Sequence, residues 1–355
     1  MKKISPSARN SFINYGIVVA FFIVFQTLLA TDNLSSSFTG QLIPICAYVV
    51  MALSLNLVVG ISGELSLGHA GFMSVGAFTG VIVATSLKNV VAVGPVRLAL
   101  AILIGALLAA IVGLLIGIPV LRLQGDYLAI VTLAFGEIIK NILNCLYIGV
   151  DAKGLHFSMT DPTIGMGGQG TIILNGPMGA VGIQKLSTFV SGIILVLIVL
   201  FIIQNLVNSR SGRAIKAIRD NRIAAEACGL NVTKYKLMAF VTSAAMAGAA
   251  GALYALNYSS IVPKKFDFNT SILILVFVVL GGIGNLRGSI IAAAVLTVLP
   301  ELLRQFQDYR MLIYAIVLIL VMLITNNPQA RALLHRIGAK FRGKSDTEEK
   351  GAVHE

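Results

Sequence analysis

The chain has 355 residues, of which 57% are hydrophobic and only 12% are charged, and its formal net charge is +12. Soluble domains carry about 25% charged residues, so this composition excludes an ordinary soluble protein and indicates lipid as the main solvent. Crossing the ~30 Å hydrocarbon core takes roughly 20 mainly apolar residues in a helix, and several such runs follow one another. The runs do not alternate polar and apolar residues, which favours helices over a β-barrel.

Ten apolar segments predict an all-α, polytopic transmembrane bundle of about 8–10 spanning or re-entrant helices. The segments lie at approximately 13–30, 42–61, 67–87, 98–120, 127–148, 188–207, 237–256, 272–283, 289–303 and 311–325. The eighth is too short to span alone. The third and eighth segments are interrupted or flanked by glycines, so either of them could form a re-entrant or a broken helix. Residues 1–325 are expected to form one transmembrane domain, followed by a basic cytoplasmic tail at 326–355.

The distribution of Lys and Arg predicts the orientation. With the N-terminus inside and ten crossings, 18 of the 27 basic residues fall on the inside and 8 on the outside. This bias favours N-in and C-in, and it explains the net charge without a nucleic-acid partner. Lys2, Lys3 and Arg9 precede the first segment, but no small-x-small cleavage site follows Ala30, so we interpret the segment as a retained anchor.

Two connections and two motif matches stand out between the segments. A polar, Gly-rich connection at 149–187 is predicted outside, and a basic one with helical character at 208–236 is predicted inside. Gly338, Gly343, Lys344 and Ser345 fit the phosphate-loop pattern, but no α/β context surrounds them, so a chance match is expected. The G-x-G-x-x-G spacing that begins at Gly165 also lacks a preceding strand. Neither match therefore predicts a nucleotide site. The three cysteines show no disulfide or metal-ligand spacing, so no metal site is predicted either.

The internal connection carries the sharpest functional signal. Residues 214–228 favour one helix, and Gly229 followed by Leu230 predicts a Schellman-type stop. Basic residues recur every third position and form a band: Arg213, Lys216, Arg219 and Arg222. Another face is small and apolar and consists of Ile215, Ile218, Ala224 and Ala225. Such a helix is expected to find nothing in its own chain to bury against. It either lies on anionic lipid or inserts into a groove on a separate subunit.

The string IAAEACG from Ile223 to Gly229 resembles the E-A-A-x-x-x-G coupling loop of ABC importer permeases, with Ile223 in place of the acid. Longer strings resemble the branched-chain amino acid permease family, M type. They are SGELSLGHAGFMSVGAFTG at 62–80, LRLQGDYLAIVTLAFGEIIKNI at 121–142, NGPMGAVGI at 175–183 and VLGGIGNLRGSIIAAAVLTVLPELLR at 279–304. Several strings in the right order are more specific than any one of them.

The resemblance implies a transport complex in a bacterial inner membrane. Family members pair with a second, LivH-like permease, two cytoplasmic ATP-binding subunits and an external solute-binding protein. ATP and Mg would then be held by partner subunits, and this chain would carry no cofactor and no catalytic residue. The coupling residues implied are Arg213, Ile215, Ile218, Ala224, Ala225 and Gly229.

Five polar residues within or beside the apolar segments are candidates for a translocation path: Asn56, Glu64, His69, Glu137 and Lys140. An unpaired carboxylate inside the membrane is costly, and Lys140 lies three residues after Glu137 on the same helical face, so the two are expected to pair or to line the path of a zwitterion. For His69 a structural role is favoured over a role as a proton relay. For Asn56 a role as an interhelical hydrogen-bonding group is favoured over a role as a pore residue.

Two functional classes follow. The first is the permease subunit of an ATP-driven importer, with branched-chain amino acids implied by the resemblance and urea, short amides or other amino acids as alternatives. The second is a secondary carrier in which Glu64, His69, Glu137 or Lys140 couples proton movement to solute. No clustered nucleophile, base and acid supports an enzyme.

Overall fold

The computed structural model describes residues 6–31, 36–123, 125–151, 154–159 and 170–303, with isolated positions between 309 and 319. Two compact units divide the chain at 1–298 and 299–355, and the elements below belong to the first unit except for the end of α11. The tenth predicted segment, the tail at 326–355 and the phosphate-loop pattern lie outside the described residues. So does most of the glycine motif that begins at Gly165.

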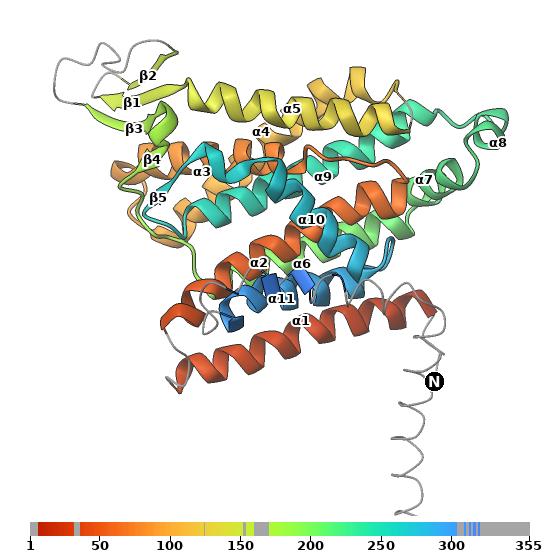
Figure 1. Cartoon of the computed structure of the whole chain (residues 1–355), viewed down its shortest axis with the longest axis horizontal. Helices are drawn as coiled ribbons and strands as arrows, with labels where there is room; N and C mark the ends of the chain where they lie inside the picture. The colour runs from red at the N-terminus through yellow and green to blue at the C-terminus, as the bar shows by residue number, and fades with distance from the viewer. Residues whose placement is uncertain are drawn as a thin grey trace, which may run out of the picture. The chain divides into compact units, whose positions relative to one another are not determined.

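Helices dominate the described part of the chain (Figure 1). The α-helices are α1 (Pro6–Ala30), α2 (Ser36–Asn56), α3 (His69–Ser86), α4 (Gly94–Val120), α5 (Asp126–Asn144), α6 (Phe189–Asn208), α7 (Arg210–Asp220), α8 (Arg222–Ala227), α9 (Val232–Ala255), α10 (Phe268–Gly281) and α11 (Leu286–Leu302). The shorter turns are η1 (Leu57–Ser62), which is π-helical, and the 3-10 turns η2 (Leu87–Asn89), η3 (Gly176–Met178) and η4 (Pro263–Phe266).

Six of the described helices are long and apolar enough to cross a membrane. They are α1, α2 with η1, α3, α4, α6 and α9. The prediction of a polytopic helical membrane protein is therefore confirmed. The eighth predicted segment is short in the structure as well, because α10 has 14 residues and ends at Gly281.

The third predicted segment is not interrupted, because α3 runs unbroken from His69 to Ser86. The irregular backbone lies just before it. The chain leaves α2 through the wide π-helical turn η1, reverses at Gly63 with φ +77°, and reaches α3 without helical hydrogen bonding between residues 63 and 68. Gly63 suits this point because the left-handed region costs a glycine nothing.

Glycine contacts hold α3, α4 and α9 together as the core of the bundle. A Cβ added to Gly76 on α3 would lie 2.0 Å from the carbonyl oxygen of Gly248 on α9, and one added to Gly248 would lie 2.4 Å from the Cβ of Ala109 on α4. Helices in lipid associate through such close backbone packing, since lipid supplies little hydrophobic drive between them. Gly76 with Gly80 on α3 and Gly248 with Ala252 on α9 have the small-x-x-x-small spacing that lets helices pack closely, and these contacts assign them to packing.

The external connection is more ordered than the sequence predicts. It forms most of a five-stranded antiparallel sheet in the order β2-β1-β3-β4-β5. The strands are β1 (Tyr147–Asp151), β2 (Gly154–Ser158), β3 (Thr171–Asn175), β4 (Ala180–Val181) and β5 (Ser260–Ile261). The last strand comes from the connection after α9, so the sheet ties two external connections to each other.

The sheet and the helices α7 and α8 lie at opposite ends of the helices (Figure 1). Arg219 of α7 bonds the carbonyl oxygen of Gly60 at 2.9 Å, and Arg287 bonds Asn14 near the start of α1 at 2.7 Å. Gly284, in the stretch after the eighth predicted segment, donates to Asn56 Oδ1 at 2.8 Å, so this stretch, the end of the second segment and the stretch after the sixth gather at one end. This agrees with the predicted topology, in which all three lie on the same side of the membrane.

Candidate coupling site and membrane-embedded polar groups

The basic internal connection folds as two short helices rather than one. Asn221 has extended backbone with φ −155°, and its Oδ1 accepts a hydrogen bond from the Ala224 N–H at 3.0 Å, so it caps α8. The prediction of a single helix over 214–228 is wrong at this residue. Asn side chains compete with the helical backbone for hydrogen bonds and favour N-cap positions, which is why the helix breaks here.

The end of α8 follows the predicted Schellman pattern. Gly229 has φ +79°, its N–H bonds the Glu226 carbonyl at 2.9 Å, and the Leu230 N–H bonds the Ala225 carbonyl at 3.1 Å. These two bonds satisfy carbonyls that the last helical turn would otherwise leave open. Gly229 is needed for its backbone, because an added Cβ would meet nothing within 4 Å.

The expectation that this region finds nothing in its own chain to bury against is wrong. Ile215 and Ile218 are 1% and 3% exposed, and Ala225 is 5% exposed. Ile218, Ala225 and Val232 form a small apolar cluster that joins α7, α8 and the start of α9. Three of the predicted coupling residues therefore hold the two helices in place and are not free for contact with another subunit.

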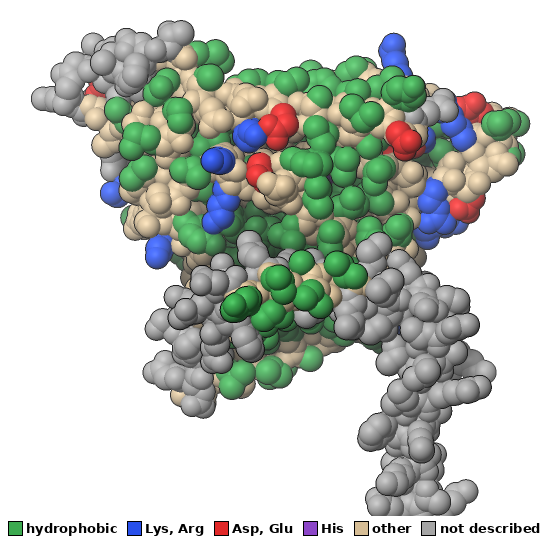
Figure 2. Space-filling model, in the orientation of Figure 1, with side chains coloured by type: hydrophobic (Ala, Val, Ile, Leu, Met, Phe, Trp, Pro, Cys, Tyr) green, Lys and Arg blue, Asp and Glu red, His purple; other side chains and the backbone are tan. Residues whose placement is uncertain are grey.

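The exposed part of the site lies at its tip. Ala224 and Gly229 are exposed there, and Arg213 is exposed in the first turn of α7, as contacts with a partner require. Ile223, which stands where the family motif has an acid, is 81% exposed and has the most exposed large apolar side chain of those that the structure describes. Ile223 is not among the predicted coupling residues, although its departure from the family motif is visible in the sequence. Figure 2 shows charged side chains gathered around α7 and α8 at this end.

Glu64 lies at the same end and does not line a described cavity. Its carboxylate forms an ion pair with Lys236 in the first turns of α9, and both side chains are 11% exposed. The pair joins the connection before α3 to the end of the basic loop.

Asn56 and His69 are buried inside the bundle, with 0% and 1% exposure. The Asn56 amide donates to Ser289 Oγ at 2.8 Å and accepts from the Gly284 N–H at 2.8 Å, which links α2 to the start of α11. A ring nitrogen of His69, Nε2, lies 2.7 Å from Ser54 Oγ and links α3 to α2. Both residues are therefore interhelical hydrogen-bonding groups in this structure.

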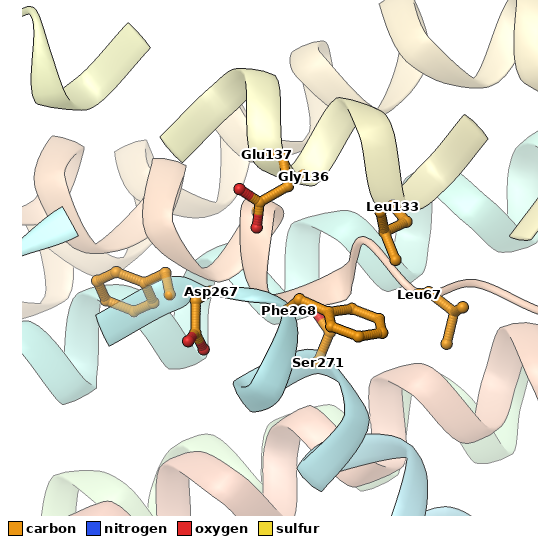
Figure 3. Close-up of a pocket in the computed structure, with 9 residues that line it drawn as sticks. Leu67, Leu133, Gly136, Glu137, Asp267, Phe268 and Ser271 are labelled. Carbon is orange, nitrogen blue, oxygen red and sulfur yellow. The ribbon is translucent and has the colours of Figure 1, made fainter. Parts of the chain in front are cut away.

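Glu137 and Lys140 pair on α5, as their spacing predicts. Glu137 also borders a small crevice of about 180 Å³, solvent at the mouth included, between α5, the start of α3 and the start of α10. Figure 3 shows Leu133, Gly136 and Glu137 on one side of it, with Asp267, Phe268 and Ser271 opposite. Of the five candidate path residues, Glu137 alone borders one of the described cavities, and its ion pair with Lys140 places a balanced charge beside that cavity.

Comparison with known proteins decides the family. Residues 37–322 match the family described as branched-chain amino acid transport system / permease component. The chain belongs to this family. It is similar to the "High-affinity branched-chain amino acid transport system permease protein LivM" of Escherichia coli (strain K12), with 38% identity over 289 residues, and of Salmonella typhimurium, with 37% identity over 287 residues. Each alignment covers 78% of this chain and 66% of the relative, so the chain spans just under two thirds of their length.

A shorter similarity links this family member to a second component of the same kind of system. The permease protein LivH of Escherichia coli (strain K12) is 32% identical over 118 residues, which cover 33% of this chain and 38% of the relative. No solved structure matches the chain.

Proposed function

We propose that this chain is the transmembrane permease subunit of an ATP-binding-cassette importer for branched-chain amino acids in a bacterial inner membrane. It would pair with a LivH-like permease, two cytoplasmic ATP-binding subunits and an external solute-binding protein. The observation that carries the proposal is the tip of α8 in a member of this family. There Ile223 projects from two helices that are held rigidly by a buried cluster of their own.

The tip suits insertion into a groove on a motor subunit. An apolar side chain that is 81% exposed gains free energy when a partner buries it, and fully burying an Ile is worth about 1.5–3 kcal/mol. The exposed guanidinium of Arg213 and the small exposed surface of Ala224 flank the same end. Ile215, Ile218 and Ala225 would transmit force through their packing, and Gly229 would hold the turn after α8. In this proposal ATP and Mg stay on the partner subunits.

The translocation path is proposed to follow the exposed face of α5. Tyr127 and Ile130 on this helix are 73% and 61% exposed, and the Glu137–Lys140 pair lies on a helix that buries few of its residues. Ionisable groups inside a membrane seldom face lipid, so a protein partner or an aqueous path is expected beside them. We propose the second permease as the neighbour of this face. Glu64, Asn56 and His69 then support the path from within this chain.

The test is reconstitution of the full complex in liposomes, with the solute-binding protein, ATP and radiolabelled leucine. Uptake that requires ATP and the partner subunits supports the proposal. Proton-driven uptake by this chain alone would establish the secondary carrier instead. Uptake of urea or a short amide in preference to leucine, isoleucine and valine would support the assignment as an importer but contradict the proposed substrate.

Ile223→Asp tests the coupling tip directly. We expect the variant to fold normally but to lose co-purification with the ATP-binding subunits by roughly tenfold or more, since about 1.4 kcal/mol of lost apolar contact corresponds to a factor of ten. Val90→Asp is the matched control, because Val90 is 78% exposed but follows α3 at the other end of the bundle. Equal retention of the ATP-binding subunits by both variants would remove Ile223 from the interface.

A further inference from the structure

Two polar contacts connect the coupling end to the irregular backbone between α2 and α3, and neither is part of the predicted coupling motif. They are the ion pair between Lys236 and Glu64 and the hydrogen bond from Arg219 to Gly60. We propose that residues 57–68, called here the α2–α3 junction, receive the motion of α7 and α8 through these contacts and pass it to the crevice beside Glu137. The inference rests on the proposed function.

The ion pair is the firmer of the two contacts. Lys236 lies near the start of α9, five residues after its N-cap Asn231, and Glu64 follows the left-handed Gly63 of the junction. Both side chains are 11% exposed, so solvent screens the pair only weakly. Removing one partner of such a pair leaves a largely buried charge without compensation, which costs more than the pair gains.

The hydrogen bond from Arg219 is held in place by a second interaction. The guanidinium Nη1 donates to the Gly60 carbonyl oxygen at 2.9 Å, while Nε and Nη2 donate to Asp220 Oδ1 at 3.1 and 2.9 Å. The stem of Arg219 lies directly against the junction, because a Cβ added to Gly63 would be 2.6 Å from its Cγ. A displacement of α7 therefore moves Arg219 against backbone rather than against flexible side chains.

The far end of the junction contacts the crevice wall. The Leu67 N–H donates to Thr132 Oγ1 of α5 at 3.1 Å, and a Cβ added to Gly68 would lie 1.9 Å from the Thr132 carbonyl oxygen. A Cβ added to Gly71 would lie 2.9 Å from the Cα of Gly136, and both glycines border the crevice together with Glu137. Motion of the junction therefore reaches α5 by backbone contact, at the residues next to the ion pair on α5.

The conformation of the junction suits a part that moves. A π-helical turn, η1, continues from the end of α2, and such turns are rare and frequently found at functional sites. The turn is followed by the left-handed Gly63 and by a stretch with no regular secondary structure. Hinges are short segments of this kind that absorb changes in φ and ψ between two rigid elements.

The experiment measures leucine uptake and ATP hydrolysis by the reconstituted complex, so that the number of molecules imported per ATP is obtained. For Lys236→Met, Glu64→Gln and Arg219→Gln we expect assembly and hydrolysis to persist while uptake per ATP falls about tenfold, within the 5–150-fold range of typical coupling free energies. Lys234→Met is the matched control in the same first turn of α9, where the side chain is exposed, and its ratio should equal that of the unaltered complex.

The charge swap Glu64→Lys with Lys236→Glu separates coupling from folding. Recovery of at least half of the lost uptake per ATP supports the linkage, because the swap restores attraction and no other contact. Unchanged uptake per ATP in the single variants would overturn the inference, as would a swap that assembles but fails to recover. If the unaltered complex shows no ATP-dependent uptake, the proposed function fails first, and the ratio is not needed to decide that.

Discussion

The helices α9 and α5 differ in how this chain surrounds them. Of the 24 residues of α9, 15 are buried, many of them Ala or Gly, whereas α5 buries four of its 19 residues. The first helix is enclosed by α3 and α4 through backbone contacts, and the second presents large apolar side chains and an ion pair on its surface.

This difference in burial distinguishes residues that stabilise the fold of this chain from residues that are exposed in this chain and available to a partner. The small residues on α9 pack against other helices of the same chain, so their role follows from this structure alone. On α5 the exposed Tyr127 and the Glu137–Lys140 pair have no such packing within the described part of this chain, and we propose that a protein partner covers them. The two helices are accordingly expected to respond differently to substitution.

The largest effect is expected from Gly248→Leu in the core. A side chain there meets the backbone of Gly105 and Ala106 and the Cβ of Ala109 within 3.4 Å, none of which can move without separating α4 from α9. We expect loss of folded protein, measured as the monodisperse fraction after extraction in mild detergent. Gly40→Leu is the control, because an added Cβ at Gly40 on α2 meets nothing within 4 Å. Similar yields from both variants would contradict the packing argument.

An intermediate effect is expected when the ion pair on α5 is broken from one side. Lys140→Met leaves Glu137 without its partner in an apolar setting, and we expect a loss of about 2 kcal/mol in stability, below the full cost of a charge at the bilayer centre because Glu137 is 34% exposed. The double variant Glu137→Gln with Lys140→Met should recover most of this loss. Thermal unfolding in lipid nanodiscs measures both, and a double variant less stable than the single one would show that the pair does not act as a unit.

The parts of the fold that follow from one-chain packing could be predicted from the sequence. The length of the apolar runs predicted that several helices are long enough to span a membrane. The last strand of the sheet, Ser260–Ile261, could not be predicted, because it pairs with residues about 80 positions earlier in the chain. Long-range pairing of two-residue strands leaves no local pattern.

The helical character of the basic internal connection could be predicted, but its break and its burial could not. The Gly229 stop follows from local backbone chemistry, and the structure has it. The burial of Ile215 and Ile218 depends on where α9 and η1 lie in space, which helical periodicity does not reveal. For the same reason Lys236 was not recognised as the partner of Glu64, 172 residues away. Whether the proposed coupling and path residues act in transport remains a prediction for the experiments above.

The smallest effect is expected at the contact between α5 and the stretch just before α3. Thr132 on α5 accepts a hydrogen bond from the Leu67 N–H at 3.1 Å and donates one to the Ala129 carbonyl at 2.9 Å. Thr132→Val keeps the shape but removes the acceptor, so the Leu67 N–H loses its partner at a cost of about 1 kcal/mol.

Thr242→Val on α9 is the matched control, because the Thr242 hydroxyl bonds only the Met238 carbonyl of its own helix in the described part of the chain. We expect a lower unfolding midpoint in nanodiscs for Thr132→Val and a nearly unchanged one for Thr242→Val. Faster hydrogen exchange at Leu67 should accompany the first change, since that amide loses its acceptor. If Leu67 exchanges equally slowly in both variants, then backbone packing of Gly68 against Thr132 holds α5 to the core, and the side-chain hydrogen bond adds little to it.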